Sequence, residues 1–130
     1  MNNIVVAITG ASGAPYAKLL LEKLMTLQDQ WQQLSVVCSS NAATVWEAEI
    51  AEENLSAFLK KNDRIRLYTN TDFSAPFASG SGNYQTMIII PCSMGTLGRI
   101  AGGISNDLIT RAADVILKER RKLICVARET

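Results

Sequence analysis

Short apolar runs alternate along the chain with longer stretches in which apolar residues recur at helical spacing. The runs predict strands over 4–8, 34–38, 65–68, 86–90 and 122–127, the fourth of them ending at Pro91. The longer stretches predict helices over 16–28, 41–53 and 107–118, with a short helix or turn over 96–101. Residues 70–83 are rich in Ser, Gly, Asn and Pro and are expected to form a loop. Such alternation is typical of an α/β protein whose parallel sheet carries helices on both faces.

The first apolar run ends in a turn of small residues, Gly10, Ala11, Ser12 and Gly13, and Pro15 then opens the next helix. Proline fits the first turn of a helix because the N–H that it lacks would have no partner there. A turn of this kind directs free backbone N–H groups and the positive end of a helix dipole at one spot, which attracts phosphate. The spacing matches neither G-x-G-x-x-G nor G-x-x-x-x-G-K-[ST], so neither the common dinucleotide fingerprint nor a P-loop is indicated. The alternative is a tight turn that binds no ligand.

Composition narrows the class of protein. The 130 residues are expected to form one domain over 1–130, and the formal net charge of +1 indicates no general attraction to nucleic acid. No signal peptide and no apolar run of membrane-spanning length is visible, which favours a cytoplasmic protein without a membrane partner. The three cysteines lack C-x-x-C spacing, so we expect buried, reduced thiols rather than a disulfide framework or a zinc site.

The chain contains no histidine, which is the commonest general acid or base at neutral pH and the commonest metal ligand. Catalysis by Ser-His-Asp or Cys-His groups is therefore excluded within the chain. Proton transfer must use carboxylates, lysine, tyrosine, cysteine, a ligand group or water. No metal site is predicted.

Polar residues follow several of the predicted strands, and ligands of parallel α/β folds bind beyond the carboxyl ends of the strands. Those after the second, fourth and last strands are Ser39, Ser40 and Asn41, then Ser93 and Thr96, then Arg128 and Glu129. Together with the first turn they would line a polar pocket of phosphate size. The alternative for the Ser, Asn and Thr residues is that they cap the helices that follow. Cys92 is expected to be a packing residue rather than a nucleophile, because no base is identifiable beside it.

Four segments resemble, in this order, the UbiX family of flavin prenyltransferases, formerly described as aromatic acid decarboxylases. They are Gly10-Ala-Ser-Gly-Ala, Ile90-Pro-Cys-Ser-Met-Gly-Thr-Leu, Arg111-Ala-Ala-Asp-Val-Ile-Leu-Lys-Glu-Arg-Arg and Arg128-Glu-Thr. The resemblance covers essentially the whole chain and implies a Rossmann-like (flavodoxin-like) three-layer fold that binds FMN and assembles into a dodecamer of trimers. It also implies transfer of a dimethylallyl group from dimethylallyl phosphate to N5 and C6 of reduced FMN, without a metal. The product, prenylated FMN, would serve a UbiD-type decarboxylase, as in ubiquinone biosynthesis or aromatic acid decarboxylation.

The resemblance also implies roles for individual residues. The expected FMN-binding residues are Gly10, Ala11, Ser12, Gly13, Ser39, Ser93, Met94, Gly95, Thr96 and Arg111. Lys118 and Arg128 match positions that contact the prenyl phosphate. Glu129 is the expected proton-handling group, because burial would raise a carboxyl pKa toward neutrality, and Ser12 matches a serine near flavin N5.

The chain departs from the resemblance in length. Family members are expected to continue for roughly a further third of a chain past Thr130, with a tyrosine and a basic residue that bind the prenyl phosphate. The chain is thus expected to be a C-terminally truncated form or a fragment, impaired in catalysis. Two other classes stay open: a non-catalytic FMN-binding or assembly module, and a flavin-dependent cysteine decarboxylase of related fold. The lack of histidine counts against the decarboxylase.

Overall fold

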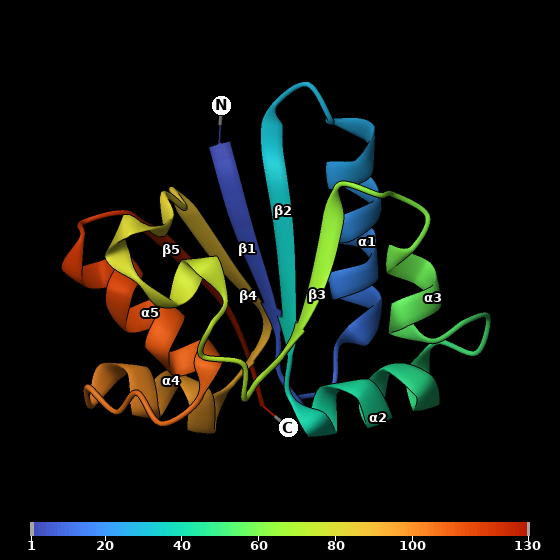
Figure 1. Cartoon of the computed structure of the whole chain (residues 1–130). Helices are drawn as coiled ribbons and strands as arrows, with labels where there is room; N and C mark the ends of the chain where they lie inside the picture. The colour runs from blue at the N-terminus through green and yellow to red at the C-terminus, as the bar shows by residue number, and fades with distance from the viewer. Residues whose placement is uncertain (1, 130) are drawn as a thin grey trace.

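The computed structural model describes residues 2–129 and contains a sheet of five parallel strands in the order β3-β2-β1-β4-β5 (Figure 1). The strands are β1 (Asn2–Ile8), β2 (Trp31–Cys38), β3 (Ile65–Thr69), β4 (Thr86–Ser93) and β5 (Lys122–Arg128). This is the strand order of a Rossmann fold. Successive strands are added on one side of β1 up to β3, and β4 and β5 are then added on its other side. The predicted α/β class with a parallel sheet is confirmed.

Helices form the outer layers. One face of the sheet carries α1 (Ala14–Thr26) and α3 (Leu55–Leu59), and the other carries α5 (Leu108–Lys118) with two short 3-10 turns, η1 (Pro76–Ala78) and η2 (Gly80–Gly82) (Figure 1). The two remaining helices, α2 (Ser40–Glu49) and α4 (Met94–Ala101), lie at the carboxyl ends of the strands, along the lower edge of the sheet in Figure 1. That edge is where a parallel sheet places its ligands.

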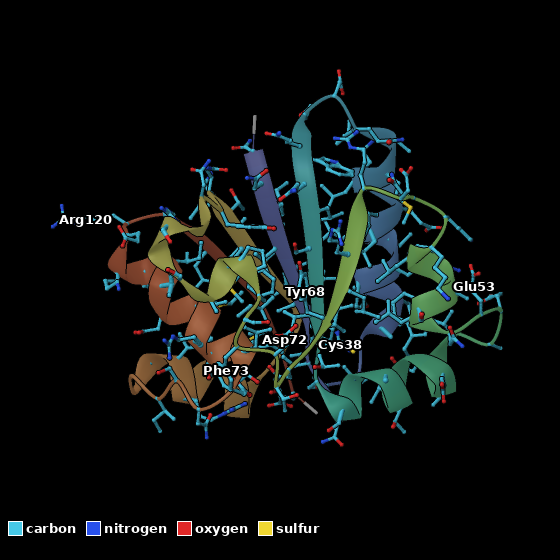
Figure 2. All side chains as sticks on the ribbon, viewed as in Figure 1. Cys38, Glu53, Tyr68, Asp72, Phe73 and Arg120 are labelled. Atoms are coloured by element: carbon cyan, nitrogen blue, oxygen red, sulfur yellow. The ribbon has the colours of Figure 1, made fainter. Side chains whose placement is uncertain are left out.

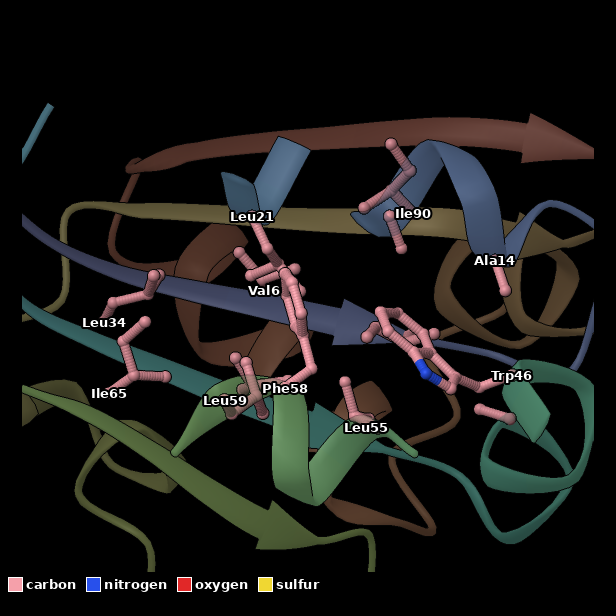
Figure 3. Packing of buried hydrophobic residues seen from close by; sticks show 14 of the residues in the cluster. Val6, Ala14, Leu21, Leu34, Trp46, Leu55, Phe58, Leu59, Ile65 and Ile90 are labelled. Carbon is pink, nitrogen blue, oxygen red and sulfur yellow. The ribbon is translucent and has the colours of Figure 1, made fainter. Parts of the chain in front are cut away.

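Each face of the sheet has its own apolar core, and β1 contributes to both. Val6 packs with Leu34, Trp46 and Phe58 under α1 and α3 (Figure 3), whereas Val5 packs against α5. Successive strand residues point to opposite faces, so a central strand covered on both sides must be apolar throughout. This is why residues 4–8 of β1 are apolar without interruption and do not alternate with polar residues.

The predicted helix over 41–53 is wrong beyond Glu49. Ile50 adopts an extended conformation, and Asn54 then caps α3 by accepting a hydrogen bond from the Ala57 N–H at 2.8 Å. The indole of Trp46 holds this connection, since its Nε1 donates to the Glu53 carbonyl at 3.0 Å. A buried aromatic ring with its polar atom satisfied thus sets the path of the chain.

The prediction that Pro91 ends the fourth strand is also wrong, because β4 continues to Ser93. Proline cannot donate to a ladder, and the pairing of β4 with β5 shifts register between Ile89 and Cys92. Thr9 takes over the link to β1: its hydroxyl donates to the Pro91 carbonyl at 2.6 Å and accepts from the Ser93 N–H at 3.0 Å. This buried side chain lets the strand pass through a proline and still reach the carboxyl edge of the sheet.

The outermost strand, β5, is covered on one face only. Leu123 and Cys125 pack into the core beneath α5, while Ile124 and Val126 on the opposite face are 41% and 36% exposed. Within residues 2–129, no helix has the length and apolar character needed to cross a bilayer.

Candidate functional site

A polar pocket of about 310 Å³ opens at the carboxyl edge of the sheet, where the strand order reverses. Its lining comes from the ends of β1 and β3 and from the segments that begin α2, α4 and α5. The lining residues are Thr9, Gly10, Ser39, Asn41, Asn70, Ser93, Gly95, Thr96, Arg99, Asp107 and Ile109. The predicted site residues Gly10, Ser39, Ser93, Gly95 and Thr96 are therefore brought together from three distant parts of the sequence.

Three helix N-termini meet at this pocket. Ser39 caps α2 by accepting from the Ala42 N–H at 3.1 Å, and Ser93 caps α4 by accepting from the Thr96 N–H at 3.2 Å. Asp107 caps α5 within a reciprocal capping box with Thr110. The capping role considered for Ser39 and Ser93 is confirmed, and both residues also line the pocket. Because the start of a helix carries a partial positive charge, three of them make the pocket attractive to an anion.

One cation, Arg99 of α4, also lines the pocket and is held in place by hydrogen bonds. Its Nη1 donates to Asp107 Oδ2 at 3.0 Å and to Asn106 Oδ1 at 3.1 Å, and its Nη2 donates to Thr96 Oγ1 at 3.3 Å. Burial would raise the pKa of Asp107, but hydrogen bonds from Thr110, Arg99 and Asn70 outweigh it and hold that pKa below its ordinary value. The carboxylate therefore stays ionised and keeps the guanidinium oriented.

The glycine turn after β1 has a different arrangement, because the Glu49 side chain at the end of α2 folds over it. Glu49 Oε1 accepts from the N–H groups of Gly13 and Ala14 at 3.1 and 2.9 Å, and Oε2 accepts from Ser12 Oγ at 2.7 Å. These hydrogen bonds lower the pKa of the Glu49 carboxyl group. A carboxylate of the chain itself thus occupies the start of α1, where the sequence predicts a phosphate.

Gly10 is required at this point by the close approach of two segments. A Cβ atom on Gly10 would lie 2.6 Å from the Asn41 Cβ at the start of α2. Gly13 has φ of +131°, a conformation that L side chains rarely adopt. The small residues of the turn therefore serve helix packing and backbone geometry.

A second hollow, of about 450 Å³ and mostly apolar, adjoins the pocket and shares Ser39, Asn70 and Asp107 with it. It lies between β3 and α2; Figure 2 shows Cys38 and Tyr68 at the corresponding ends of β2 and β3. The two hollows together offer an anion-attracting end and an apolar end, which is the pattern of a site for a phosphorylated ring compound.

The remaining predicted residues lie elsewhere. Arg111 and Lys118 line a separate hollow of about 290 Å³ on the exposed side of α5, with Ser79, Ser105 and Asp114. Arg128 lies by the turn after β1: its Nε donates to the Ser12 carbonyl at 3.3 Å and its guanidinium stacks 5.2 Å from the Tyr16 ring centroid.

The burial expected of Glu129 is wrong within one chain: the residue is exposed and, within the described residues, makes no side-chain hydrogen bond. Met94 is 52% exposed at the start of α4, and the last residue of the Arg-Glu-Thr motif, Thr130, lies outside the described residues. Within one chain the structure therefore does not bring Lys118 to Arg128, nor Arg111 to the pocket.

The cysteines are free thiols. Cys92 is fully buried and burial raises its pKa to about 12, which agrees with a packing role. The expectation that all three are buried is wrong for Cys38 and Cys125, which are half-buried at the sheet edge and on the outermost strand.

Sequence reasoning missed Glu49, Arg99, Asn70 and Asp107. Each acts through a contact between distant segments, such as the 37 residues that separate Ser12 from Glu49, and no local pattern reveals such contacts. Asp107 alone carried a signal, because an aspartate before an apolar helical stretch is a common cap.

Comparison with known proteins agrees with the motifs. The family model described as Flavoprotein matches residues 1–129. The chain belongs to this family. It is 46% identical over 126 residues to the flavin prenyltransferase UbiX of Thermoplasma acidophilum, a match that covers 97% of this chain and 66% of that protein. The resemblance to UbiX-type proteins is therefore confirmed.

Solved structures of UbiX-type proteins also resemble this chain. The crystal structure of AnUbiX (PadA1) in complex with FMN and dimethylallyl pyrophosphate has a TM-score of 0.89 and 40% identity, covering 99% of this chain and 65% of that one. A dodecameric FMN-dependent Ubix-like decarboxylase from Escherichia coli O157:H7 also has a TM-score of 0.89, with 38% identity, covering 98% of this chain and 67% of that one. The chain spans 66%, 65% and 64% of the length of three curated UbiX relatives that it matches.

Proposed function

We propose that this member of the Flavoprotein family is the FMN-binding part of a flavin prenyltransferase, which joins a dimethylallyl group from dimethylallyl phosphate to reduced FMN. The pocket at the strand-order reversal carries the proposal, since three helix N-termini and Arg99 surround it. The relatives at about 40% identity that are named flavin prenyltransferases support it.

The residues present fit FMN. The pocket offers hydroxyls, helix N-termini and a guanidinium for the phosphate and ribityl chain, and the adjoining hollow offers apolar surface for a ring system. Their volumes of about 310 and 450 Å³ lie in the range of ligand sites. Ser39, Ser93 and Thr96 would hold the polar part. When bound and reduced, FMN would supply the electron-rich ring that accepts the prenyl group.

Joining the prenyl group to C6 of the flavin would release the proton on that carbon, and the chain's own groups would accept it. Ser12 Oγ donates to Glu49 Oε2 at 2.7 Å, so the hydroxyl can pass a proton to a carboxylate that is already ionised. Glu129 is a second acceptor at the same end of the sheet, beyond β5. A histidine-free site must rely on such carboxylates.

The donor phosphate needs cations, and Arg128, Lys118 and Arg111 are the proposed ones. Because Arg128 lies at the carboxyl end of β5 and Lys118 at the far end of α5, we infer that a homo-oligomer brings Lys118 of one copy toward Arg128 of another. The proposed product, prenylated FMN, would pass to a UbiD-type decarboxylase in the cytoplasm.

The second candidate is an FMN-binding module without catalysis. It is favoured by one observation: the pocket with Ser39, Ser93 and Thr96 fits FMN, whereas Arg111 and Lys118, two of the cations proposed for the donor phosphate, lie in a separate hollow.

One experiment separates the candidates. The purified chain is incubated anaerobically with reduced FMN and dimethylallyl phosphate, and the flavin product is identified by its mass. A prenylated flavin supports the transferase, whereas retained FMN of unchanged mass selects the binding module. Failure to retain any flavin would refute both. The variant Glu49→Gln should retain FMN but slow the reaction, and Arg120→Gln serves as the matched surface control.

A further inference from the structure

Among residues 2–129, Arg99 is the cationic side chain that lines the anion-attracting pocket, and its hydrogen bonds use only part of its guanidinium. A guanidinium has five N–H donors. Three of them are used by Asp107, Asn106 and Thr96, so two have no partner among the described residues. The side chain is 35% exposed and lines the pocket, so a ligand can reach these donors.

We infer that Arg99 binds the phosphate group of the flavin and makes the site select FMN over riboflavin. The inference rests on the proposed flavin-binding function and assigns the phosphate end of the ligand to α4 and α5. Arg111, the arginine that the sequence suggested for FMN, lies on the exposed side of α5 and does not line this pocket.

Both carboxylate oxygens of Asp107, which also lines the pocket, already accept hydrogen bonds from the chain. Its Oδ1 accepts from the N–H and the hydroxyl of Thr110, and its Oδ2 accepts from Asn70 Nδ2 and from Arg99. The carboxylate thus caps α5 and fixes the orientation of the guanidinium. The starts of α2 and α4 add their partial positive charges on the other sides of the pocket.

The alternative phosphate position, the turn after β1, is closed by the chain itself. The N–H groups of Gly13 and Ala14 already donate to Glu49, and a phosphate there would lie against an ionised carboxylate. At Arg99 a phosphate meets unpaired donors in a fork that matches its oxygens. The guanidinium of Arg99 thus keeps donors that no described residue uses, whereas the N–H groups of Gly13 and Ala14 at the turn are already used by Glu49.

The test compares two flavins that differ only in the phosphate. Dissociation constants of FMN and riboflavin are measured by quenching of flavin fluorescence, for the wild type, Arg99→Gln, Arg99→Lys and the control Arg120→Gln. Arg120 projects away from the fold (Figure 2) and follows the carboxyl end of α5, whereas the pocket is lined by residues at the start of that helix. We expect Arg99→Gln to weaken FMN binding by roughly ten- to a hundredfold, as for a lost hydrogen bond to a charged group, with riboflavin binding unchanged. Arg99→Lys should lose less, since it keeps the charge but not the fork.

Each result decides the inference. Selective loss of FMN affinity in Arg99→Gln supports it. Equal FMN affinity in wild type and variant, or equal loss for both flavins, overturns it while leaving flavin binding intact. If the wild type itself binds FMN and riboflavin equally well, the inference is overturned. This comparison needs no variant, so it holds even if Arg99→Gln folds poorly. If the wild type binds neither flavin, the proposed function fails as well.

Discussion

A single hydroxyl, that of Thr9, joins the two central strands at the point where a proline interrupts their pairing. It donates to the Pro91 carbonyl and accepts from the Ser93 N–H, and Ser93 in turn caps α4. The position of the first turn of α4 therefore depends on the side chain of the residue that directly follows β1. This is a buried polar group that is fully used, the arrangement in which a hydrogen bond matters most.

We expect Thr9→Val to destabilise the fold by about 1–3 kcal/mol, because it leaves the Ser93 N–H and one acceptor position unsatisfied. Thr9→Ser, which keeps the hydroxyl, should lose much less. Urea denaturation of both variants measures the free energy of unfolding. Equal stability of Thr9→Val and the wild type would show that this hydroxyl does not hold the strands.

Glu49 gives a prediction for pH dependence. Its folded-state pKa lies below the ordinary value of 4.5, so its contribution to stability is present above that value and disappears as the pH falls through the folded-state pKa. The difference in unfolding free energy between wild type and Glu49→Gln should therefore be greatest at neutral pH and shrink in acid. A difference that grows on acidification would contradict the described hydrogen bonds.

At the scale of elements, α2, α4 and α5 contribute to the pocket mainly through the residues at their starts. The start of α5 is fixed by Asp107 and by Asn70 after β3, whose Oδ1 accepts from the Ile109 N–H at 2.8 Å. The strand end, the helix start and Arg99 of α4 thus form one connected unit.

Asp107→Ala should destabilise the protein by about 0.5–2 kcal/mol, the usual effect of losing an N-cap, whereas Asp107→Asn keeps the cap and should cost far less. Thermal or urea unfolding compares the two. If the alanine and asparagine variants are equally stable, the cap is not what fixes α5.

Much of this architecture is predictable because a buried parallel strand has a simple signature, a continuous apolar run. The run from Ile4 to Ile8 predicts its strand, and helical spacing predicts α5. The errors occur where a tertiary contact overrides the local signal: Thr9 carries β4 through Pro91, and Trp46 guides the chain out of α2. The site divides in the same way, since Ser39 and Ser93 follow from their places after strands, whereas Arg99 and Glu49 depend on contacts across the fold.

At the scale of the whole molecule, the cations expected to bind the donor are divided between two regions. Arg128 lies beside α1, and Arg111 and Lys118 lie on the exposed side of α5. The open face of β5, with Ile124 and Val126, adds apolar surface near Arg128. The proposal that one donor site uses both groups therefore requires a neighbouring copy of the chain to supply one of them.

Complementation tests this arrangement in the complete enzyme. Lys118→Gln and Arg128→Gln should each reduce prenyl transfer and leave FMN bound. Oligomers assembled from both variants should regain part of the activity, because some sites then combine an intact Lys118 with an intact Arg128. If verified mixed oligomers recover no activity, Lys118 and Arg128 either act in a site formed by one chain or do not act in the site at all.

The three helix starts that face one pocket also have a thermodynamic consequence. The starts of α2 and α4 and the Arg99 guanidinium place positive charge around the pocket, and an anion bound there would stabilise the folded state. Folding and ligand loading then become one linked equilibrium. At a free ligand concentration of 100 times Kd, such a ligand adds about 2.7 kcal/mol to the free energy of unfolding. Inorganic phosphate should therefore raise the Tm more than chloride at equal ionic strength, and FMN more than riboflavin. An unchanged Tm in phosphate would show that the pocket does not bind this anion at the concentration used.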